Sequence, residues 1–205
     1  MSADATFWDR IAPKYAKQPI SNIPAYETTL ERVRSYLKAT DRVIEFGAGT
    51  GSTALRLAPH VSRYLATDLS PGMAAIGEEK RRAEGISNLR IASGVVADFT
   101  AEDVTVALGF NVFHLVDDPK ADFERIYEML PSAGLFISKT PAIGSKWYFR
   151  PLVRVMQAFG KAPRPVHFLS VEALDAEIRA AGFEIVETGL YPPETPSRFI
   201  VARKP

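Results

Sequence analysis

The chain has 205 residues, of which 25 are Lys or Arg and 24 are Asp or Glu, giving a formal net charge of +1. This length suits one domain, and 46% hydrophobic with 24% charged residues argues against a wholly disordered, collagen-like or coiled-coil protein. Cysteine is absent, which excludes disulfides, thiolate metal sites and a cysteine nucleophile.

The first forty residues are expected to form a helical cap ahead of the first strand. One helix is predicted from Asp4 to about Tyr15, with an interruption near Pro13. A second helix is predicted to begin between Ser21 and Pro24, where a capping side chain and a first-turn proline occur together.

After the cap, short apolar runs alternate with helical segments. Strands are predicted at residues 43–46, 63–67, 89–93, 104–110, 135–139, 183–190 and 199–203. The main helices among them are predicted at residues 52–58, 71–84, 119–130 and 171–181. This α/β alternation predicts a doubly wound, mainly parallel sheet of seven strands, and the last two strands, with no helix between them, form an antiparallel edge pair.

The segment before the last predicted helix carries an unusual charge. No Asp or Glu occurs between Met129 and Val171, and a Trp-Tyr-Phe cluster stands at residues 147–149. The basic residues of this stretch are Lys139, Lys146, Arg150, Arg154, Lys161 and Arg164. We expect residues 141–169 to be an insertion over the sheet edge. Its apolar helix covers a core or a pocket, and its bases hold an anionic substrate, lie on an anionic membrane surface or form a solvated face.

The sharpest signal is VIEFGAGTG at residues 43–51, where a strand leads into three glycines and a helix follows. Glycines there permit a tight turn and let a ligand approach the backbone. Asp68 ends the next strand, where a carboxylate can accept hydrogen bonds from both hydroxyls of a ribose. The pattern predicts a nucleoside-containing cofactor, and the plainer alternative is a structural glycine turn.

A dinucleotide is the nearest competing cofactor. Its fingerprint, G-x-G-x-x-G, requires a glycine where Ser52 stands. Glu45, two residues before the first glycine, is unfavourable beside a pyrophosphate and suits a cationic ligand. An NAD(P)-dependent oxidoreductase therefore stays as an alternative.

The chain resembles class I S-adenosylmethionine-dependent methyltransferases of the small-molecule type, and it is similar to the ubiquinone and menaquinone biosynthesis enzymes. The resemblance runs from FWDRIAPKY (7–15) through VIEFGAGTG and ATDLSPGM (66–73) to FHLVDDPKADFERIYEMLPSAGLFIS (113–138). It implies a Rossmann-like methyltransferase fold, S-adenosyl-L-methionine as cofactor, and methyl transfer to a small molecule. The basic, aromatic segment before the last helix is the one indication that this acceptor is anionic or lipidic. A methyltransferase-like protein that binds without catalysis is a further alternative.

The resemblance also implies a set of cofactor-binding residues. They are Tyr15, Glu45, Gly47, Ala48, Gly49, Gly51, Asp68, Leu69, Val95 and Val96. In the family pattern an Asp follows the glycine after the third strand, but here Val95 does, and the next acid is Asp98. Contact with the adenine then falls either to backbone groups near Val95 and Val96 or to Asp98.

A catalytic base is needed when the acceptor atom is a hydroxyl oxygen. His114, just past the fourth predicted strand, and His167, in the basic insertion, are the candidate catalytic residues, and Tyr148 is a weaker one. For His114 the alternative is a histidine hydrogen-bonded within the fold. The three histidines are widely spaced, so no metal site is expected.

We therefore expect a single methyltransferase domain over residues 1–205, with the cap (1–40) and the insertion (141–169) forming a lid over the substrate. The N-terminus lacks the features of a signal peptide, and no run reaches the roughly 18 apolar residues of a membrane span, so a cytoplasmic location is expected. The expected partner is a small-molecule substrate and no nucleic acid, because the charge is balanced and cysteine is absent. A peripheral membrane contact and the oligomeric state stay open.

Overall fold

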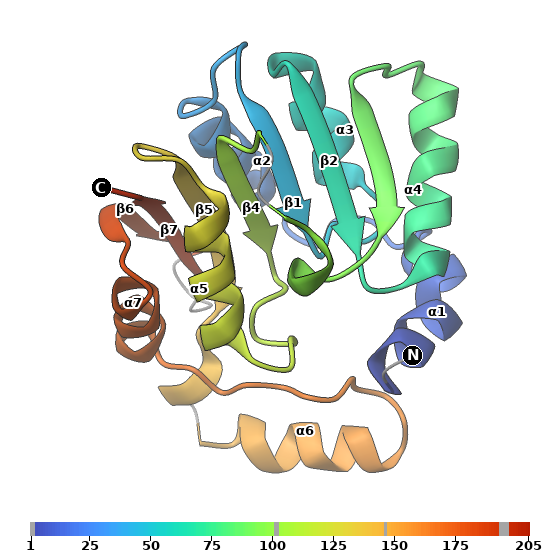
Figure 1. Ribbon diagram of the computed structural model, residues 1–205. Helices are drawn as coiled ribbons and strands as arrows, with labels where there is room; N and C mark the ends of the chain where they lie inside the picture. Colours follow the sequence, from blue (N-terminus) through green and yellow to red (C-terminus); the bar gives the residue numbers. More distant parts are fainter. Residues whose placement is uncertain (1–2, 101–102, 146, 193–196) are drawn as a thin grey trace.

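A twisted sheet of seven strands forms the centre of the computed structural model, which describes residues 3–100, 103–145, 147–192 and 197–205 (Figure 1). The strands are β1 (Arg42–Phe46), β2 (Arg63–Asp68), β3 (Leu89–Ser93), β4 (Val106–Phe110), β5 (Leu135–Pro141), β6 (Glu184–Leu190) and β7 (Ser197–Arg203). Their order across the sheet is β3-β2-β1-β4-β5-β7-β6. The first five strands run parallel, and β7 is antiparallel to both β5 and β6, which confirms the predicted edge pair.

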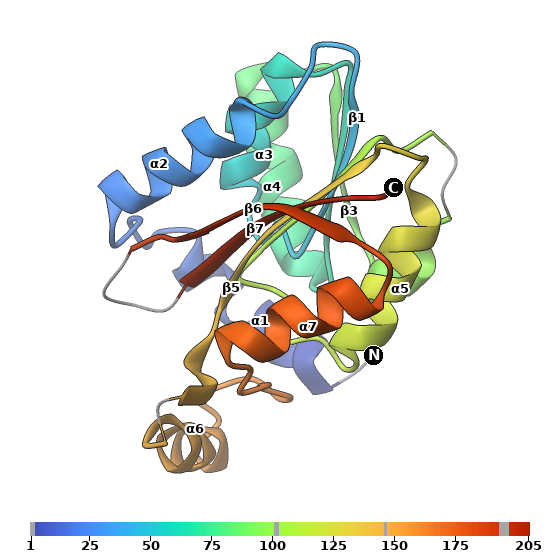
Figure 2. The same ribbon diagram turned by 90° about the vertical axis from the view of Figure 1, so that its left-hand side faces the viewer.

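Helices cover both faces of the sheet (Figure 2). The helices are α1 (Ala3–Tyr15), α2 (Ile23–Arg34), α3 (Ser52–Leu57), α4 (Pro71–Glu84), α5 (Pro119–Met129), α6 (Phe149–Ala158) and α7 (Val171–Ala180). Helices α2, α3 and α4 contribute to one buried cluster, and α5 and α7 contribute to another on the opposite face. The doubly wound α/β class is therefore confirmed.

Helix boundaries follow local capping chemistry where the sequence supplies it. The side chains of Ser70, Asp118 and Ser170 accept hydrogen bonds from backbone N–H groups three residues further on, at the starts of α4, α5 and α7. Helix α4 ends at Gly85, which adopts a left-handed conformation with φ of 67°. These signals explain why the predicted bounds of α4 agree with the structure.

Pro13 does not interrupt the first helix, contrary to the prediction. Helix α1 continues to Tyr15, and beyond it the N–H of Ala16 still donates to the carbonyl of Ala12 at 2.9 Å. Pro13 lies in the last turn, so its missing N–H removes only one late bond. Ala5 and Ala12 are buried and α1 packs against α4, so tertiary contacts hold the helix.

The insertion between β5 and α7 contains α6 and a return segment, residues 160–169, which we call the strap. Figures 1 and 2 show α6 standing apart from the sheet, at the end where β1, β2 and β4 terminate. None of the ten residues of α6, all of which the structure describes, is buried, so this helix does not cover a core as the sequence suggested. Lys146 lies outside the described residues. Among the described helices, none is long and apolar enough to cross a membrane.

Candidate functional site

A cavity of about 690 Å³ opens at the carboxyl ends of the parallel strands, beneath α1 and the segment that leads to α2. Ligands bind at this edge in open α/β sheets because the loops that leave the strands diverge there. Nine of the ten cofactor-binding residues implied by the resemblance line the cavity: Tyr15, Glu45, Gly47, Ala48, Gly49, Asp68, Leu69, Val95 and Val96. The fold thus brings together residues that lie up to 81 positions apart in the chain.

Gly51 is the one residue of that set that does not line the cavity. It caps the start of α3 with φ of 75°, and a Cβ there would lie 2.8 Å from Cδ1 of Ile91. The third glycine therefore lets α3 approach β3 and α4 closely, and the other two glycines face the cavity.

Asp68 ties the two loops of the site together. Its Oδ2 accepts a hydrogen bond from the N–H of Gly49 at 2.8 Å, and its Oδ1 accepts one from the N–H of Ser70 at 2.9 Å. Burial raises the pKa of Asp68, and these two backbone donors oppose the shift. Each carboxylate oxygen keeps a further lone pair, so the side chain can also accept from hydroxyl groups in the cavity.

Glu45 places a carboxyl group in the cavity floor and is only 2% exposed. Its Oε2 accepts a hydrogen bond from the hydroxyl of Tyr64 at 2.7 Å. Burial raises the pKa of Glu45 to about 7, and the nearby charge of Asp68 adds to the shift. A buried carboxyl group of this kind favours a cationic ligand, whose charge would stabilise the ionised form.

The cap closes the cavity with aromatic side chains. Tyr15 is 45% exposed, and its Cε1 would lie 3.7 Å from a Cβ placed on Gly49. Trp8, two turns earlier on the same face of α1, makes an edge contact with the Tyr15 ring at 6.4 Å between centroids. The hydroxyl of Tyr15 has a raised pKa, first because of burial and then because of Asp68.

The loop after β3 bears on which group would contact an adenine, the backbone near Val95 and Val96 or the carboxylate of Asp98. Oδ2 of Asp98 accepts a hydrogen bond from the N–H of Val95 at 2.9 Å and holds a short turn over Val96–Asp98. Val95 and Val96 line the cavity, but Asp98 is absent from the described residues that line it. The backbone near Val95 and Val96 is therefore better placed to contact an adenine than the carboxylate of Asp98.

Neither histidine predicted as a base is found among the described residues that line the cavity. The ring Nε2 of His167 lies 2.8 Å from the carbonyl oxygen of Val116, and its backbone N–H donates to the carbonyl of His114 at 2.7 Å. Burial, with a smaller effect of His167, lowers the pKa of His114 to about 4. The two contacts of His167 fasten the strap to the loop after β4. The lowered pKa of His114 leaves its ring neutral at physiological pH.

Sequence reasoning missed several other residues that line the cavity, among them Trp8, Tyr26 and Asn111. Asn111 follows the end of β4 directly, and that position alone was a signal for the site. Trp8 and Tyr15 lie seven positions apart, which places them on one face of α1. The hydroxyl of Tyr26 lies 3.4 Å from that of Thr53, so this side chain reaches the cavity from α2.

The two cavity-facing glycines provide a matched test. Gly47 and Gly49 have φ of 65° and 56°. A Cβ on Gly47 would lie 2.4 Å from Cγ2 of Val112, whereas a Cβ on Gly49 would lie 3.7 Å from Cε1 of Tyr15, an ordinary contact distance. We expect Gly49→Ala to lower the free energy of unfolding by about 1 kcal/mol from backbone strain, and Gly47→Ala by about 3 kcal/mol because crowding adds to it. Urea unfolding measures both, and equal losses would contradict this account.

Comparison with known proteins adds to this geometry. The methyltransferase domain family matches residues 19–188. A chondramide synthase of Chondromyces crocatus is 37% identical over 146 residues, which are 67% of this chain and 4% of that protein. A demethylmenaquinone methyltransferase of Thermobifida fusca is 28% identical over 105 residues, 49% of this chain and 44% of that protein. The matches thus span half or less of the length of these relatives.

The solved structures agree on the fold. A phosphoethanolamine N-methyltransferase of Haemonchus contortus, in complex with phosphomonomethylethanolamine and S-adenosylhomocysteine, superposes with a TM-score of 0.80 and 16% sequence identity. The superposition covers 100% of this chain and 61% of that one. At this identity the likeness shows the shared fold alone.

Proposed function

We infer, from the premise that this chain belongs to the methyltransferase domain family, that it is an S-adenosylmethionine-dependent methyltransferase of small molecules. We propose that the acceptor is a largely apolar, lipid-like compound. The observation that supports this most is the composition of the cavity wall away from the glycine loop. The apolar and aromatic side chains there are Trp8, Ile20, Tyr26, Phe110 and Phe113, and the charged residues that also line the cavity are Asp117, Asp118, Asp122 and Arg125.

The residues present fit the cofactor. A cavity-facing Gly49 leaves open space for it, Asp68 offers carboxylate lone pairs, and Glu45 offers a negative charge in the cavity floor. When bound, S-adenosylmethionine would supply a methyl group on a positively charged sulfur. The acceptor would bond to the methyl carbon as the carbon–sulfur bond breaks, and S-adenosylhomocysteine would be the leaving group. The protein's task is then to hold the acceptor in line and to exclude water.

Each part of the chain has a separate share in that task. We assign Asp68 to the ribose hydroxyls and Glu45 to the positively charged part of the cofactor. The aromatic rings of Trp8 and Tyr15 cover the cavity and keep water out. Burial raises the pKa of Tyr26, so its hydroxyl stays neutral and can orient an acceptor by a hydrogen bond.

We further propose that the cap and the insertion act together as the lid. Cap residues from Trp8 to Ser21 line the cavity. The guanidinium of Arg10 donates to the carbonyl of Gly160 at 2.7 Å, which joins α1 to the beginning of the strap. At its other end the strap is held by His167 at the loop after β4. The lid is thus connected to both sides of the cavity.

We expect methyl transfer to need neither histidine as a base. His167→Gln keeps a side chain that can donate to the Val116 carbonyl, so kcat/KM should stay within about threefold of the wild-type value, with an unchanged pH profile. A general base contributes typically 10²–10⁴-fold, so loss of such a base would be plain in the same assay. His114→Gln is the companion variant, and a loss of about a hundredfold in either would restore the histidine as a catalytic candidate.

The acceptor proposal is tested with matched pairs of hydroxylated compounds that differ only in a carboxylate. S-adenosylhomocysteine formation is followed for each pair. We expect the uncharged, apolar member to react with the higher kcat/KM, because apolar side chains offer a carboxylate no partner and the three carboxylates of Asp117, Asp118 and Asp122 disfavour a further negative charge. Consistently faster reaction of the carboxylated members would contradict the proposal and favour an anionic acceptor.

A further inference from the structure

Helix α6 turns an apolar face to solvent. Tyr148, Leu152, Val155, Met156 and Phe159 recur at helical spacing, and we call them the stripe. Their exposed fractions are 46, 50, 56, 37 and 74%, respectively. An ordinary amphipathic surface helix packs its apolar side on the core, so α6 has the reverse orientation.

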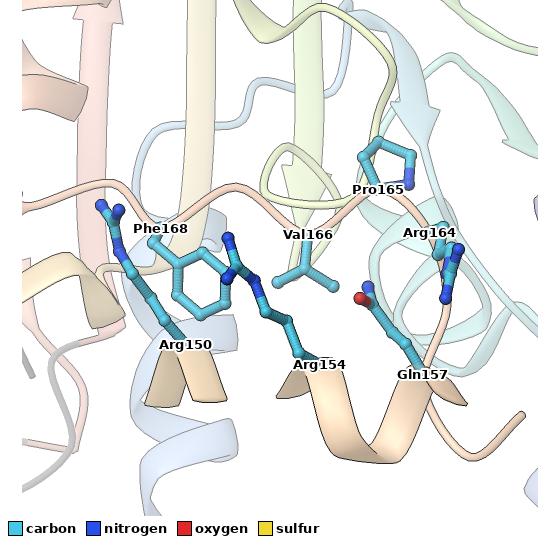
Figure 3. Close-up of a pocket in the computed structure, with 7 residues that line it drawn as sticks. All are labelled: Arg150, Arg154, Gln157, Arg164, Pro165, Val166 and Phe168. Atoms are coloured by element: carbon cyan, nitrogen blue, oxygen red, sulfur yellow. The ribbon is translucent and has the colours of Figure 1, made fainter. Parts of the chain in front are cut away.

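The polar face of α6 looks toward the protein instead. Figure 3 shows Arg150, Arg154 and Gln157 rising from the helix toward the strap. Between helix and strap lies a cavity of about 520 Å³, lined by these three residues and by Arg164, Pro165, Val166 and Phe168. Gln157 Nε2 donates to the carbonyl of Pro163 at 2.7 Å, and the guanidinium of Arg150 lies 5.5 Å from the centre of the Phe168 ring.

Two arginines of this cavity, Arg150 and Arg154, form no ion pair with any residue that the structure describes, in contrast to Arg32, Arg81 and Arg198 elsewhere in the chain. The sequence has no Asp or Glu from residue 130 to 170, so the whole insertion carries positive charge. Helix α6 thus presents an uncovered apolar stripe on one face and, on the opposite face, two arginines that no described carboxylate pairs with.

The charge pattern identifies what covers the stripe. A partner that fits must be apolar where the stripe lies and anionic at the level of the opposite, basic face, as for a helix that lies in the plane of a membrane interface. A second copy of α6 would bring like charges together, and the face of one ten-residue helix is small against the roughly 800 Å² per partner of a stable protein interface. A bilayer with anionic headgroups satisfies both requirements at once.

We propose that α6 binds the surface of a membrane that contains anionic phospholipids, with the stripe inserted at the level of the upper acyl chains and lipid phosphates held at Arg150 and Arg154. Trp147, which is 80% exposed and immediately precedes this segment, then lies at the interface, where its ring is best accommodated. The strap connects α6 to the loop after β4, so the membrane-bound helix is itself part of the proposed lid over the cavity. The binding itself does not depend on which acceptor is methylated.

Vesicle flotation of the full chain tests the proposal. We expect binding to vesicles of phosphatidylcholine with phosphatidylserine, and at least tenfold weaker binding to pure phosphatidylcholine. Leu152→Ser and Phe159→Ser should each weaken binding about tenfold, and Arg150→Gln with Arg154→Gln about fivefold for each charge removed. The matched control is Val186→Ser, because Val186 is 47% exposed on β6, away from α6, and its replacement should change nothing.

A second readout uses tryptophan emission. The chain has two tryptophans, so Trp8→Phe leaves Trp147 as the single reporter. Its emission should shift to shorter wavelength with anionic vesicles and stay unchanged with soluble glycerol phosphate. Binding of glycerol phosphate without vesicle binding, equal binding to neutral and anionic vesicles, or a dimer that Leu152→Ser dissociates without any vesicle binding would each overturn the proposal. Retained binding of S-adenosylhomocysteine by the stripe variants shows that they are folded and separates this test from that of the methyltransferase site.

Discussion

Glu45→Gln is expected to be more stable than the wild-type chain at pH 8 and more weakly bound to S-adenosylmethionine. Burial raises the pKa of Glu45 from 4.5 in the unfolded reference to about 7 in the folded protein. Between these two values the folded state binds more protons than the unfolded state, so the stability contributed by this group falls as the pH rises. Above about pH 7 the ionised buried carboxylate costs about 3 kcal/mol relative to solvent.

Glutamine removes that cost, and its amide oxygen can still accept from the hydroxyl of Tyr64. Thermal unfolding of both proteins at pH 5 and pH 8 measures the effect. The gap between them should open as the pH rises, because the other titrating groups are common to both chains. A gap of the same size at the two pH values would contradict the assignment of the raised pKa to Glu45.

The same substitution acts on cofactor binding in the opposite sense. A positively charged ligand favours ionised Glu45, so binding to the wild-type chain should release a proton and weaken as the pH falls below about 7. Glu45→Gln should bind about a hundredfold more weakly, with little dependence on pH in this range. Calorimetric titration in buffers of different ionisation enthalpy measures the proton release directly, and its absence would remove Glu45 from the cofactor site.

Asp68→Ala is the second substitution with a large expected effect. It removes the acceptor for the part-buried N–H groups of Gly49 and Ser70, and each donor left unpaired costs about 1 kcal/mol or more. It also removes the charge-assisted hydrogen bonds to the ribose, so the affinity for S-adenosylhomocysteine should fall about a hundredfold. Urea unfolding and calorimetric titration measure the two losses separately.

Asp9→Ala is its matched control. Asp9 accepts hydrogen bonds from the hydroxyl of Ser70 and from the N–H of Gly72, but it is absent from the described residues that line the cavity. Its loss should therefore reduce stability without a comparable loss in affinity once both are measured on folded protein. Unchanged affinity in Asp68→Ala, or equal affinity losses in the two variants, would contradict the ribose assignment.

The sequence predicted the parts of the site that local chemistry determines. Gly47 and Gly49 lie in the loop after β1 and Asp68 ends β2, and parallel strands bring such positions to one edge of the sheet. Gly51 could not be separated from them, because its role in packing against Ile91 depends on how α3 meets β3. Pro13 was overweighted because the contact between α1 and α4 has no local signal.

The insertion was the least predictable part of the chain. The apolar period of α6 was visible in the sequence, but periodicity does not say which face points to solvent. His167 was a candidate because it belongs to the basic insertion, which was expected to face the substrate, and in the structure its ring Nε2 lies at the Val116 carbonyl. Long-range packing decides both outcomes.

The claim that the cavity at the strand ends is the S-adenosylmethionine site is tested most directly by calorimetric titration of the full chain with S-adenosylhomocysteine, with NADH titrated alongside. The account predicts micromolar binding of S-adenosylhomocysteine, lost in Asp68→Ala, and no binding of NADH. Binding of NADH alone, or of neither ligand to a chain that unfolds cooperatively, would contradict it.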